Sequence, residues 1–180
     1  MEKFERIDWK LIHHGAVIDY YQDQVRDENG LVKTYDSIIH KGAAAVVAVN
    51  NDGRIFMVKQ YRNILDRFTL ELPAGGKDSV EEPGIVWAAR ELEEETGYKS
   101  EDLEFLISIR TTVAFCNEAI DIYVARNLVP SKQNLDEGEF IDVELYDIET
   151  LISMIYDQKI QDSKTVCALL AYYNKYVLKK

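Results

Sequence analysis

Six glutamates crowd into the fifteen residues Glu81–Glu95, and this density is the first sign of chemistry in the chain. On an α-helix, Glu91, Glu94 and Glu95 fall at positions i, i+3 and i+4 and therefore share one face. Like charges at this spacing destabilise an isolated helix, which is tolerable if the face binds hard divalent cations. Carboxylate oxygens suit Mg2+ or Mn2+, whereas zinc fits less well because no Cys or His accompanies the cluster.

A glycine loop precedes this segment and supplies the other half of the expected site. Gly75 and Gly76 follow Pro73, and because they lack a Cβ they let the backbone approach a bound cation closely. We expect a carbonyl ligand from Gly75. A metal ion held by few carboxylates keeps open positions for a diphosphate and an attacking water. The chemistry that this pattern indicates is metal-assisted hydrolysis of a phosphoanhydride.

The length of 180 residues and the hydrophobic content of 47% indicate one compact domain, with room at most for an appended arm. The net charge of -11, from 32 Asp+Glu against 21 Lys+Arg, argues against a nucleic-acid partner. No apolar run approaches the roughly 18 to 20 residues of a membrane span, and the N-terminus lacks an apolar signal core. Cys116 and Cys167 show neither disulfide nor zinc spacing. We therefore expect a cytoplasmic protein that binds no membrane.

Two hairpin patterns occupy the N-terminal part of the chain. Apolar and polar residues alternate on both sides of the turn sequence Asp27–Gly30, which predicts a first hairpin. The turn sequence at 50–53 lies between an apolar run over 43–49 and a strand pattern over 54–61. This arrangement predicts a second hairpin directly after the first.

The rest of the chain predicts further strands and three helices. Strand patterns cover 68–72, 103–110, 119–125 and 140–145, and helical patterns cover about fifteen residues from Pro83, then 148–156 and 163–177. Strands interspersed with a few helices predict an α/β fold in which helices cover the faces of a mixed sheet. We expect residues 1–40 to form a β-strand arm and residues 41–180 to form the main domain.

Nine positions between Gly76 and Tyr98 match every fixed position of a known signature: Gly76-x5-Glu82-x7-Arg90-Glu91-Leu92-x-Glu94-Glu95-x-Gly97-Tyr98. This signature is the Nudix box, and the chain accordingly resembles the Nudix hydrolases. The resemblance implies an α/β/α sandwich, dependence on Mg2+ and cleavage of nucleoside diphosphates linked to another moiety.

The resemblance also implies a role for each matching residue. These roles are metal binding for Glu91, Glu94 and Glu95, outer or water-mediated metal binding for Glu82, orientation of a box glutamate for Arg90, and substrate contact for Gly76. Among them, Glu94, Glu95 and Arg90 are expected to take part in catalysis.

Upstream of the box, Val58–Arg62 and Leu70–Gly75 resemble the ADP-ribose pyrophosphatase branch of the family. In that branch the residues matching Arg62 and Glu71 contact the substrate, although the two also fit an ordinary ion pair. The residue matching Glu118 helps to bind metal or acts as general base. The chain departs from the branch at two places, because it lacks the Ser-Pro-Gly ahead of Glu118 and has no arginine in the strand before Gly42.

Relatives in that branch exchange the N-terminal hairpin between two subunits and use aromatic side chains to enclose adenine. The resemblance thus implies a homodimer in which Tyr20, Tyr21 and Tyr35 are candidates for the base stack. Our main hypothesis is Mg2+-dependent hydrolysis of ADP-ribose to AMP and ribose 5-phosphate. One alternative keeps the chemistry with another nucleoside diphosphate sugar or a dinucleotide, and another is a non-catalytic nucleotide-sensing module.

Overall fold

The computed structural model describes residues 4–77, 79, 81–136 and 138–178. Within it the chain divides into two compact units. The first contains the described residues up to Gly42 together with Arg110–Ala119, and the second contains Ala43–Ile109 and the described residues from Ile120 onward. None of the described helices has the length and apolar character needed to cross a membrane.

The first unit is an antiparallel sheet in the order β1-β2-β3, formed by β1 (Glu5–His14), β2 (Asp19–Arg26) and β3 (Val32–Ile39). The predicted first hairpin is confirmed in β2 and β3, which pair antiparallel along their whole length. The Asp27 carboxylate closes the turn by accepting hydrogen bonds from the N–H groups of Asn29 and Leu31. Gly30 takes the left-handed conformation that this turn needs, with φ of 83°.

The second unit holds the remaining elements, whose strands form two larger sheets and one pair. Its strands are β4 (Ala43–Ala48), β5 (Ile55–Arg62), β6 (Arg67–Glu71), β7 (Ala74–Gly76), β8 (Tyr98–Lys99), β9 (Asp102–Arg110), β10 (Ala119–Arg126), β11 (Val129–Pro130) and β12 (Ile141–Tyr146), and its helices are α1 (Gly84–Thr96), α2 (Ile148–Tyr156) and α3 (Ser163–Tyr172). The sheet orders are β7-β4-β10-β9, β12-β5-β6 and β11-β8. Because β4 runs parallel to β10 and antiparallel to β7, the predicted mixed sheet is confirmed.

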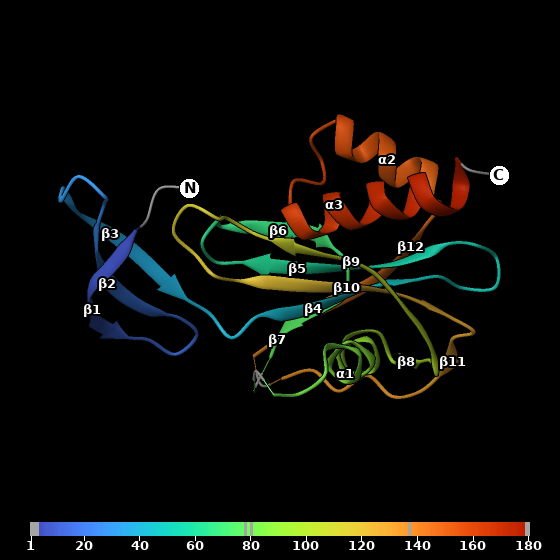
Figure 1. Cartoon of the computed structure of the whole chain (residues 1–180). Helices are drawn as coiled ribbons and strands as arrows, with labels where there is room; N and C mark the ends of the chain where they lie inside the picture. The colour runs from blue at the N-terminus through green and yellow to red at the C-terminus, as the bar shows by residue number, and fades with distance from the viewer. Residues whose placement is uncertain (1–3, 78, 80, 137, 179–180) are drawn as a thin grey trace. The chain divides into compact units, whose positions relative to one another are not determined.

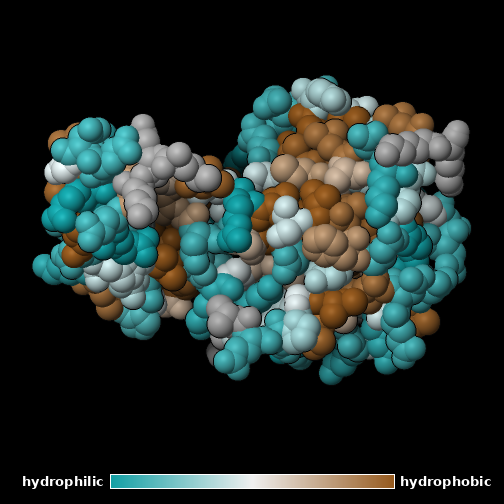
Figure 2. All heavy atoms as spheres, viewed as in Figure 1, coloured by the Kyte–Doolittle hydropathy of each residue, from teal (hydrophilic) through white to brown (hydrophobic). Residues whose placement is uncertain are grey.

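The sheets of the second unit lie between two helical layers, with α2 and α3 on one face and α1 on the other (Figure 1). Alternate residues of β4 explain this layering. Ala45 and Val47 belong to the core cluster that includes Leu151 of α2 and Leu169 of α3, whereas Val46 belongs to the cluster around α1. On the face shown in Figure 2, hydrophobic side chains gather where α3 packs onto the sheets. The expected α/β/α sandwich is therefore confirmed.

The predicted second hairpin is wrong, because β4 and β5 belong to different sheets, and beside the turn the chain forms only an isolated bridge between Val49 and Ile55. The turn between them does form, and the Asn50 side chain accepts hydrogen bonds from the N–H groups of Asp52 and Arg54. All six residues of β4 are buried, and the strand pairs on both edges with β7 and β10. Because β7 and β10 occupy both edges of β4, neither edge is available for a hairpin with β5.

The three predicted helices are present. Gly97 ends α1 in the left-handed conformation, with φ of 71° and an N–H that donates to the Glu93 carbonyl. The helical pattern over 163–177 divides in the structure, because α3 ends at Tyr172 and continues as a π-helical turn over Tyr173–Val177.

Candidate active site

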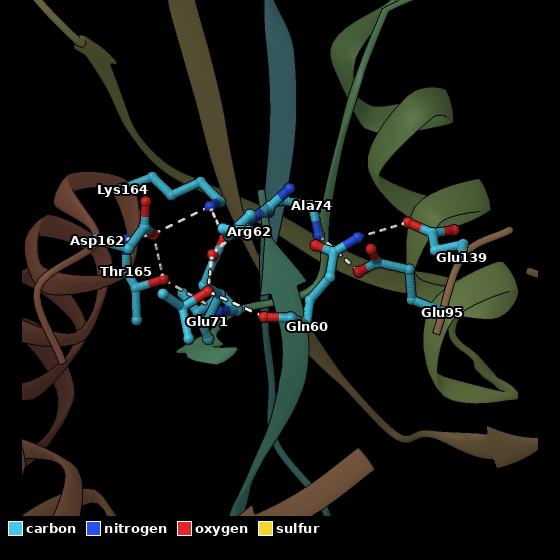
Figure 3. Close-up of polar contacts among 11 residues, drawn as sticks. Gln60, Arg62, Glu71, Ala74, Glu95, Glu139, Asp162, Lys164 and Thr165 are labelled. Atoms are coloured by element: carbon cyan, nitrogen blue, oxygen red, sulfur yellow. Dashed lines mark hydrogen bonds and ion pairs between the residues drawn. The ribbon is translucent and has the colours of Figure 1, made fainter. Parts of the chain in front are cut away.

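Helix α1 places its glutamates against the second unit's sheet. Ala88 and Leu92 are fully buried and fix the helix on β4. Glu95 lies on the same buried side and is only 4% exposed. Its Oε2 accepts a hydrogen bond of 2.8 Å from the N–H of Ala74, the first residue of β7 (Figure 3). The glutamate helix and the glycine strand are thus joined directly.

Gly75 lies so close to the helix that a side chain at this position would have to displace the Glu91 carboxylate. A Cβ on Gly75 would lie 2.3 Å from the carboxylate atoms of Glu91. The structure therefore brings together Glu91 and Gly75, whose carbonyl we expect to be a metal ligand. Gly76 pairs with Ala43 at the end of β7. Metal binding by Gly75 and substrate contact by Gly76 stay predictions.

The box carboxylates Glu91 and Glu95 are electrostatically unbalanced. Burial raises the pKa of Glu91 to about 7, and the neighbouring Glu94 adds to the rise. Burial also raises the pKa of Glu95 to about 8, against the hydrogen bond from the Ala74 N–H, and Glu91 contributes to the rise. Of the three glutamates that the helical spacing placed on one face, Glu94 therefore acts on Glu91, and Glu91 acts on Glu95.

These carboxylates fit a hard divalent cation in chemistry. They offer only oxygen donors, the positive charge of Arg90 does not outweigh the effect of burial on Glu91, and Gly75, which lacks a Cβ, lets the Glu91 carboxylate approach the backbone of β7. Within the described ranges, no group of three or more Asp, Glu, His or Cys side chains is already arranged to hold a metal ion. A bound ion would therefore have to draw the carboxylates toward a common point.

Arg90 lies beside the other box glutamate. Its Nη2 is 3.6 Å from Oε2 of Glu82, and its guanidinium stacks 3.8 Å above the centre of the Trp87 ring. Its charge also lowers the pKa of Glu91, opposing the effect of burial. The geometry is compatible with the expected role of Arg90 in orienting a box glutamate, and its part in catalysis stays a prediction, as does metal binding by Glu82.

The half-exposed Arg62 and the buried Glu71 form an ion pair in the same unit. Nε and Nη2 of Arg62 donate to the two carboxylate oxygens of Glu71 over 2.8 and 2.7 Å. Oγ1 of Thr69 and Nζ of Lys164 donate to the same carboxylate (Figure 3). Burial by itself would raise the pKa of Glu71, but Arg62 and Lys164 outweigh it and lower the pKa to about 2.

A cavity of about 370 Å³ adjoins this pair. Its charged and amide lining consists of Arg62, Arg67, Glu71, Gln161, Asp162 and Lys164. Three cationic side chains thus face two carboxylates, in a chain whose net charge is -11. The size is within the usual range for small-molecule sites.

Sequence reasoning missed two groups that the structure brings to these residues. Glu139 accepts a hydrogen bond of 2.7 Å from Nε2 of Gln60, and its charge raises the pKa of both Glu91 and Glu95. The other group is Lys164, at the start of α3. Neither Glu139 nor Lys164 lies within a local sequence pattern that would have pointed to it.

Glu118 lies in the first unit, in the segment that joins the N-terminal sheet. Its Oε1 is 3.4 Å from Nδ1 of His40, and the same nitrogen accepts a hydrogen bond of 2.9 Å from the N–H of Gly42. Because Nδ1 acts as an acceptor there, it carries no proton to share with Glu118 in this arrangement. The predicted roles of Glu118 stay predictions.

Comparison with known proteins gives a consistent family. The NUDIX domain model matches residues 39–169. The methanol dehydrogenase activator of Bacillus methanolicus is 41% identical over 166 residues, covering 91% of this chain and 89% of the relative. The ADP-ribose pyrophosphatase of Bacillus subtilis (strain 168) is 38% identical over 160 residues, covering 88% and 86%.

A solved structure supports the fold. The chain superimposes on a crystal structure described as an ADP compounds hydrolase with a TM-score of 0.84, covering 96% of this chain and 93% of the other. The sequence identity of 20% limits this likeness to the architecture.

Proposed function

The chain belongs to the NUDIX family of hydrolases, and we propose that it cleaves the diphosphate bond of ADP-ribose with Mg2+, giving AMP and ribose 5-phosphate. The observation that carries the metal-dependent chemistry is the pair formed by the partly buried Glu91 and the buried Glu95. Burial raises their pKa values to about 7 and about 8, and the positive charges of Arg90 and Lys164 do not outweigh it. The named relative from Bacillus subtilis supports ADP-ribose as the substrate.

Glu91, Glu94 and Glu95 would hold the ion, with the Gly75 carbonyl and a water-mediated contact to Glu82. Bound there, Mg2+ would supply charge to the diphosphate and lower the pKa of the attacking water. The protein's own groups have separate tasks. Arg62 offers a guanidinium for the diphosphate, as arginine does in many phosphate sites, and Arg90 holds Glu82 in place.

Two carboxylates are candidates for the general base. Glu118 is the one that the family resemblance implies, and Glu139 is the one whose charge acts on both Glu91 and Glu95. Replacing each by Gln distinguishes them, since loss of the base lowers kcat by roughly 100-fold or more and leaves KM little changed. If only Glu139→Gln has this effect, the assignment to Glu118 is wrong.

We propose that two copies of the chain form a homodimer through the first unit, in the cytoplasm. Its sheet exposes large hydrophobic side chains, among them Leu11, Ile12 and Tyr35, which a partner subunit would cover. Cys116 and Cys167 are both free thiols, as suits a reducing compartment.

A regulatory role is the second candidate. The relative from Bacillus methanolicus is named as an activator of another enzyme, so binding to a dehydrogenase is compatible with the same fold. A purely nucleotide-sensing module would bind ADP-ribose without turnover.

The test is an assay of the purified protein with ADP-ribose and Mg2+, in which AMP and ribose 5-phosphate are measured. We expect turnover that stops when metal is removed by chelation and returns with Mg2+, and also with Mn2+. A panel of other nucleoside diphosphate sugars and dinucleotides run in parallel identifies the preferred substrate. Binding of ADP-ribose without release of AMP would refute the hydrolase and favour the sensing module.

A further inference from the structure

The carboxylate of Glu71 is saturated with hydrogen bonds. Oε1 accepts from Nε of Arg62 and Oγ1 of Thr69, and Oε2 accepts from Nη2 of Arg62 and Nζ of Lys164. A carboxylate has about four acceptor positions in all. Glu71 is also 3% exposed. It has no remaining capacity to accept a substrate hydroxyl, so its role lies in holding other groups.

Arg62 is the group that this arrangement holds. Its bidentate pair with Glu71 fixes the plane of the guanidinium, while Nη1 has no partner in the described part of the chain. The Arg62 side chain is 37% exposed and lines the cavity of about 370 Å³. One edge of the guanidinium is therefore fixed by the protein, and the other remains available to a phosphate oxygen.

The fourth donor to Glu71 comes from a different layer of the fold. Lys164, in the first turn of α3, is 11% exposed and also donates to Asp162 over 3.0 Å. Asp162 in turn caps α3 by accepting the N–H of Thr165 over 3.0 Å. The position of Lys164 is thus set by the helix, and the position of Glu71 is set by Lys164.

A second contact ties the same two elements together. Oγ1 of the fully buried Thr165 accepts the N–H of Leu72 over 3.0 Å and donates to Asp162 over 2.6 Å. Two residues after Leu72, the N–H of Ala74 reaches Glu95. The first turn of α3 consequently fixes the end of β6 just before the strand that contacts the box glutamates (Figure 3).

We propose that Lys164 is a positioning residue of the active site, which acts through Glu71 to hold the Arg62 guanidinium against the diphosphate of the substrate. The proposal rests on the proposed function, because it assumes that Arg62 binds a diphosphate. It assigns a part in substrate binding to α3, which contributes no residue of the Nudix box.

Steady-state kinetics with ADP-ribose and saturating Mg2+ test the proposal in four variants. Lys164→Met removes the charge and keeps the chain length, and we expect KM to rise roughly tenfold with kcat within about threefold. Lys164→Arg restores a donor and should keep KM within about threefold of the wild type. Thr69→Val removes another donor to Glu71 and should raise KM in the same direction. Lys159→Met, at an exposed lysine paired with Asp157, is the matched control and should leave both constants unchanged.

A double-variant cycle separates positioning from a merely structural effect. If Lys164 acts through Glu71, Lys164→Met adds little to KM once Glu71→Gln is present. Wild-type KM in Lys164→Met, or effects that multiply in the double variant, would overturn the proposal. Thermal unfolding is measured for every variant. If Lys164→Met does not fold, an unchanged KM in Thr69→Val would overturn the proposal.

Binding of inorganic pyrophosphate, measured by calorimetry in the presence of Mg2+, distinguishes a failure of the proposed function from a failure of the positioning role. If the wild type does not cleave ADP-ribose but Lys164→Met weakens pyrophosphate binding about tenfold, the proposed function fails and the positioning role stands. If the wild type cleaves ADP-ribose and Lys164→Met behaves like it in both experiments, the positioning role fails alone. A wild type that neither binds pyrophosphate nor turns over ADP-ribose contradicts both.

Discussion

Glu71 and Glu95 are buried to nearly the same degree, at 3% and 4% exposed, yet their acidities are opposite. The pKa of Glu71 is lowered to about 2, whereas that of Glu95 is raised to about 8. Burial acts in the same direction on both, so the difference must come from their partners. The comparison separates a carboxylate whose charge is paired with cationic side chains from one whose charge is not.

The partners explain the difference. Glu71 accepts four hydrogen bonds, three of them from the cationic side chains of Arg62 and Lys164. Glu95 accepts one hydrogen bond from a backbone N–H and lies near the like charge of Glu91. A buried carboxylate without a cation is costly, and a divalent ion would remove that cost. The cluster at Glu71 is complete by itself, whereas Glu95 accepts no hydrogen bond from a cationic side chain among the described residues.

The largest effect is expected for Glu95→Gln. The neutral amide resembles the protonated acid but cannot bind a cation as a carboxylate does, so we expect turnover to fall roughly 1,000-fold. Thermal unfolding of the metal-free protein should occur at the same temperature or higher, because the amide replaces a group whose pKa is raised to about 8 and, unlike that group, cannot ionise. A metal-free variant clearly less stable than the wild type would contradict the contrast with Glu71.

Glu93→Gln is the matched control for that experiment. Glu93 lies on the same helix but its carboxylate accepts a hydrogen bond from Ser131. Turnover should therefore stay close to the wild type. Loss of activity in both variants would mean that the effect reflects the charge of the helix as a whole.

The next effect is on stability and concerns Glu71→Gln. Removing one partner of a buried ion-pair network leaves Arg62 and Lys164 with excess positive charge, at a cost of about 3 kcal/mol in the free energy of unfolding. Urea titration measures this loss. Glu104→Gln is the control, because Glu104 pairs with Arg126 and Lys175 at the surface, where water screens the charges. Equal losses in the two variants would remove the distinction between a buried network and a surface pair.

A smaller effect is expected for Gly75→Ala, which places a methyl group 2.3 Å from the Glu91 carboxylate. Displacement of Glu91 should lower turnover roughly tenfold to 100-fold with little change in unfolding temperature. Gly53→Ala gives the opposite result, since Gly53 has φ of 81° and open space around it. That variant should lose stability and keep its activity, and a fully active Gly75→Ala would argue against a close approach at Glu91.

Local sequence patterns predicted most of the fold. Helix α2 spans Ile148–Tyr156, the predicted range, and Gly97 ends α1 as expected. These features depend on helical spacing and on glycine chemistry within a few residues. The predicted hairpin of β4 and β5 failed because β4 pairs in parallel with β10, more than seventy positions later in the chain.

The same limit applies to the site. Glu91, Glu94 and Glu95 were recognisable because all three lie on one helix face at fixed spacing. Glu139 and Lys164 reach their partners across 79 and 93 residues of sequence, and no periodicity connects them. The completeness of the Glu71 cluster therefore depends on the tertiary fold.

The central claim is that Glu91 and Glu95 hold protons near neutral pH in the metal-free protein, Glu91 only in part, and release them when they bind Mg2+ as carboxylates. Their folded pKa values of about 7 and about 8 lie above the ordinary value of 4.5. Between pH 4.5 and about pH 8 the folded state therefore binds more protons than the unfolded state. The stability that these groups contribute is fully present below pH 4.5 and is lost as the pH rises through 7 and 8. Glu71 behaves oppositely, because its contribution is present above pH 4.5 and is lost as the pH falls toward 2.

The most direct measurement is calorimetry of Mg2+ binding in buffers of different ionisation enthalpy, which counts the protons released. At pH 7 we predict the release of roughly one to two protons per protein chain, falling toward zero at pH 9 and reduced in Glu95→Gln. Binding of Mg2+ at pH 7 without proton release would contradict the account.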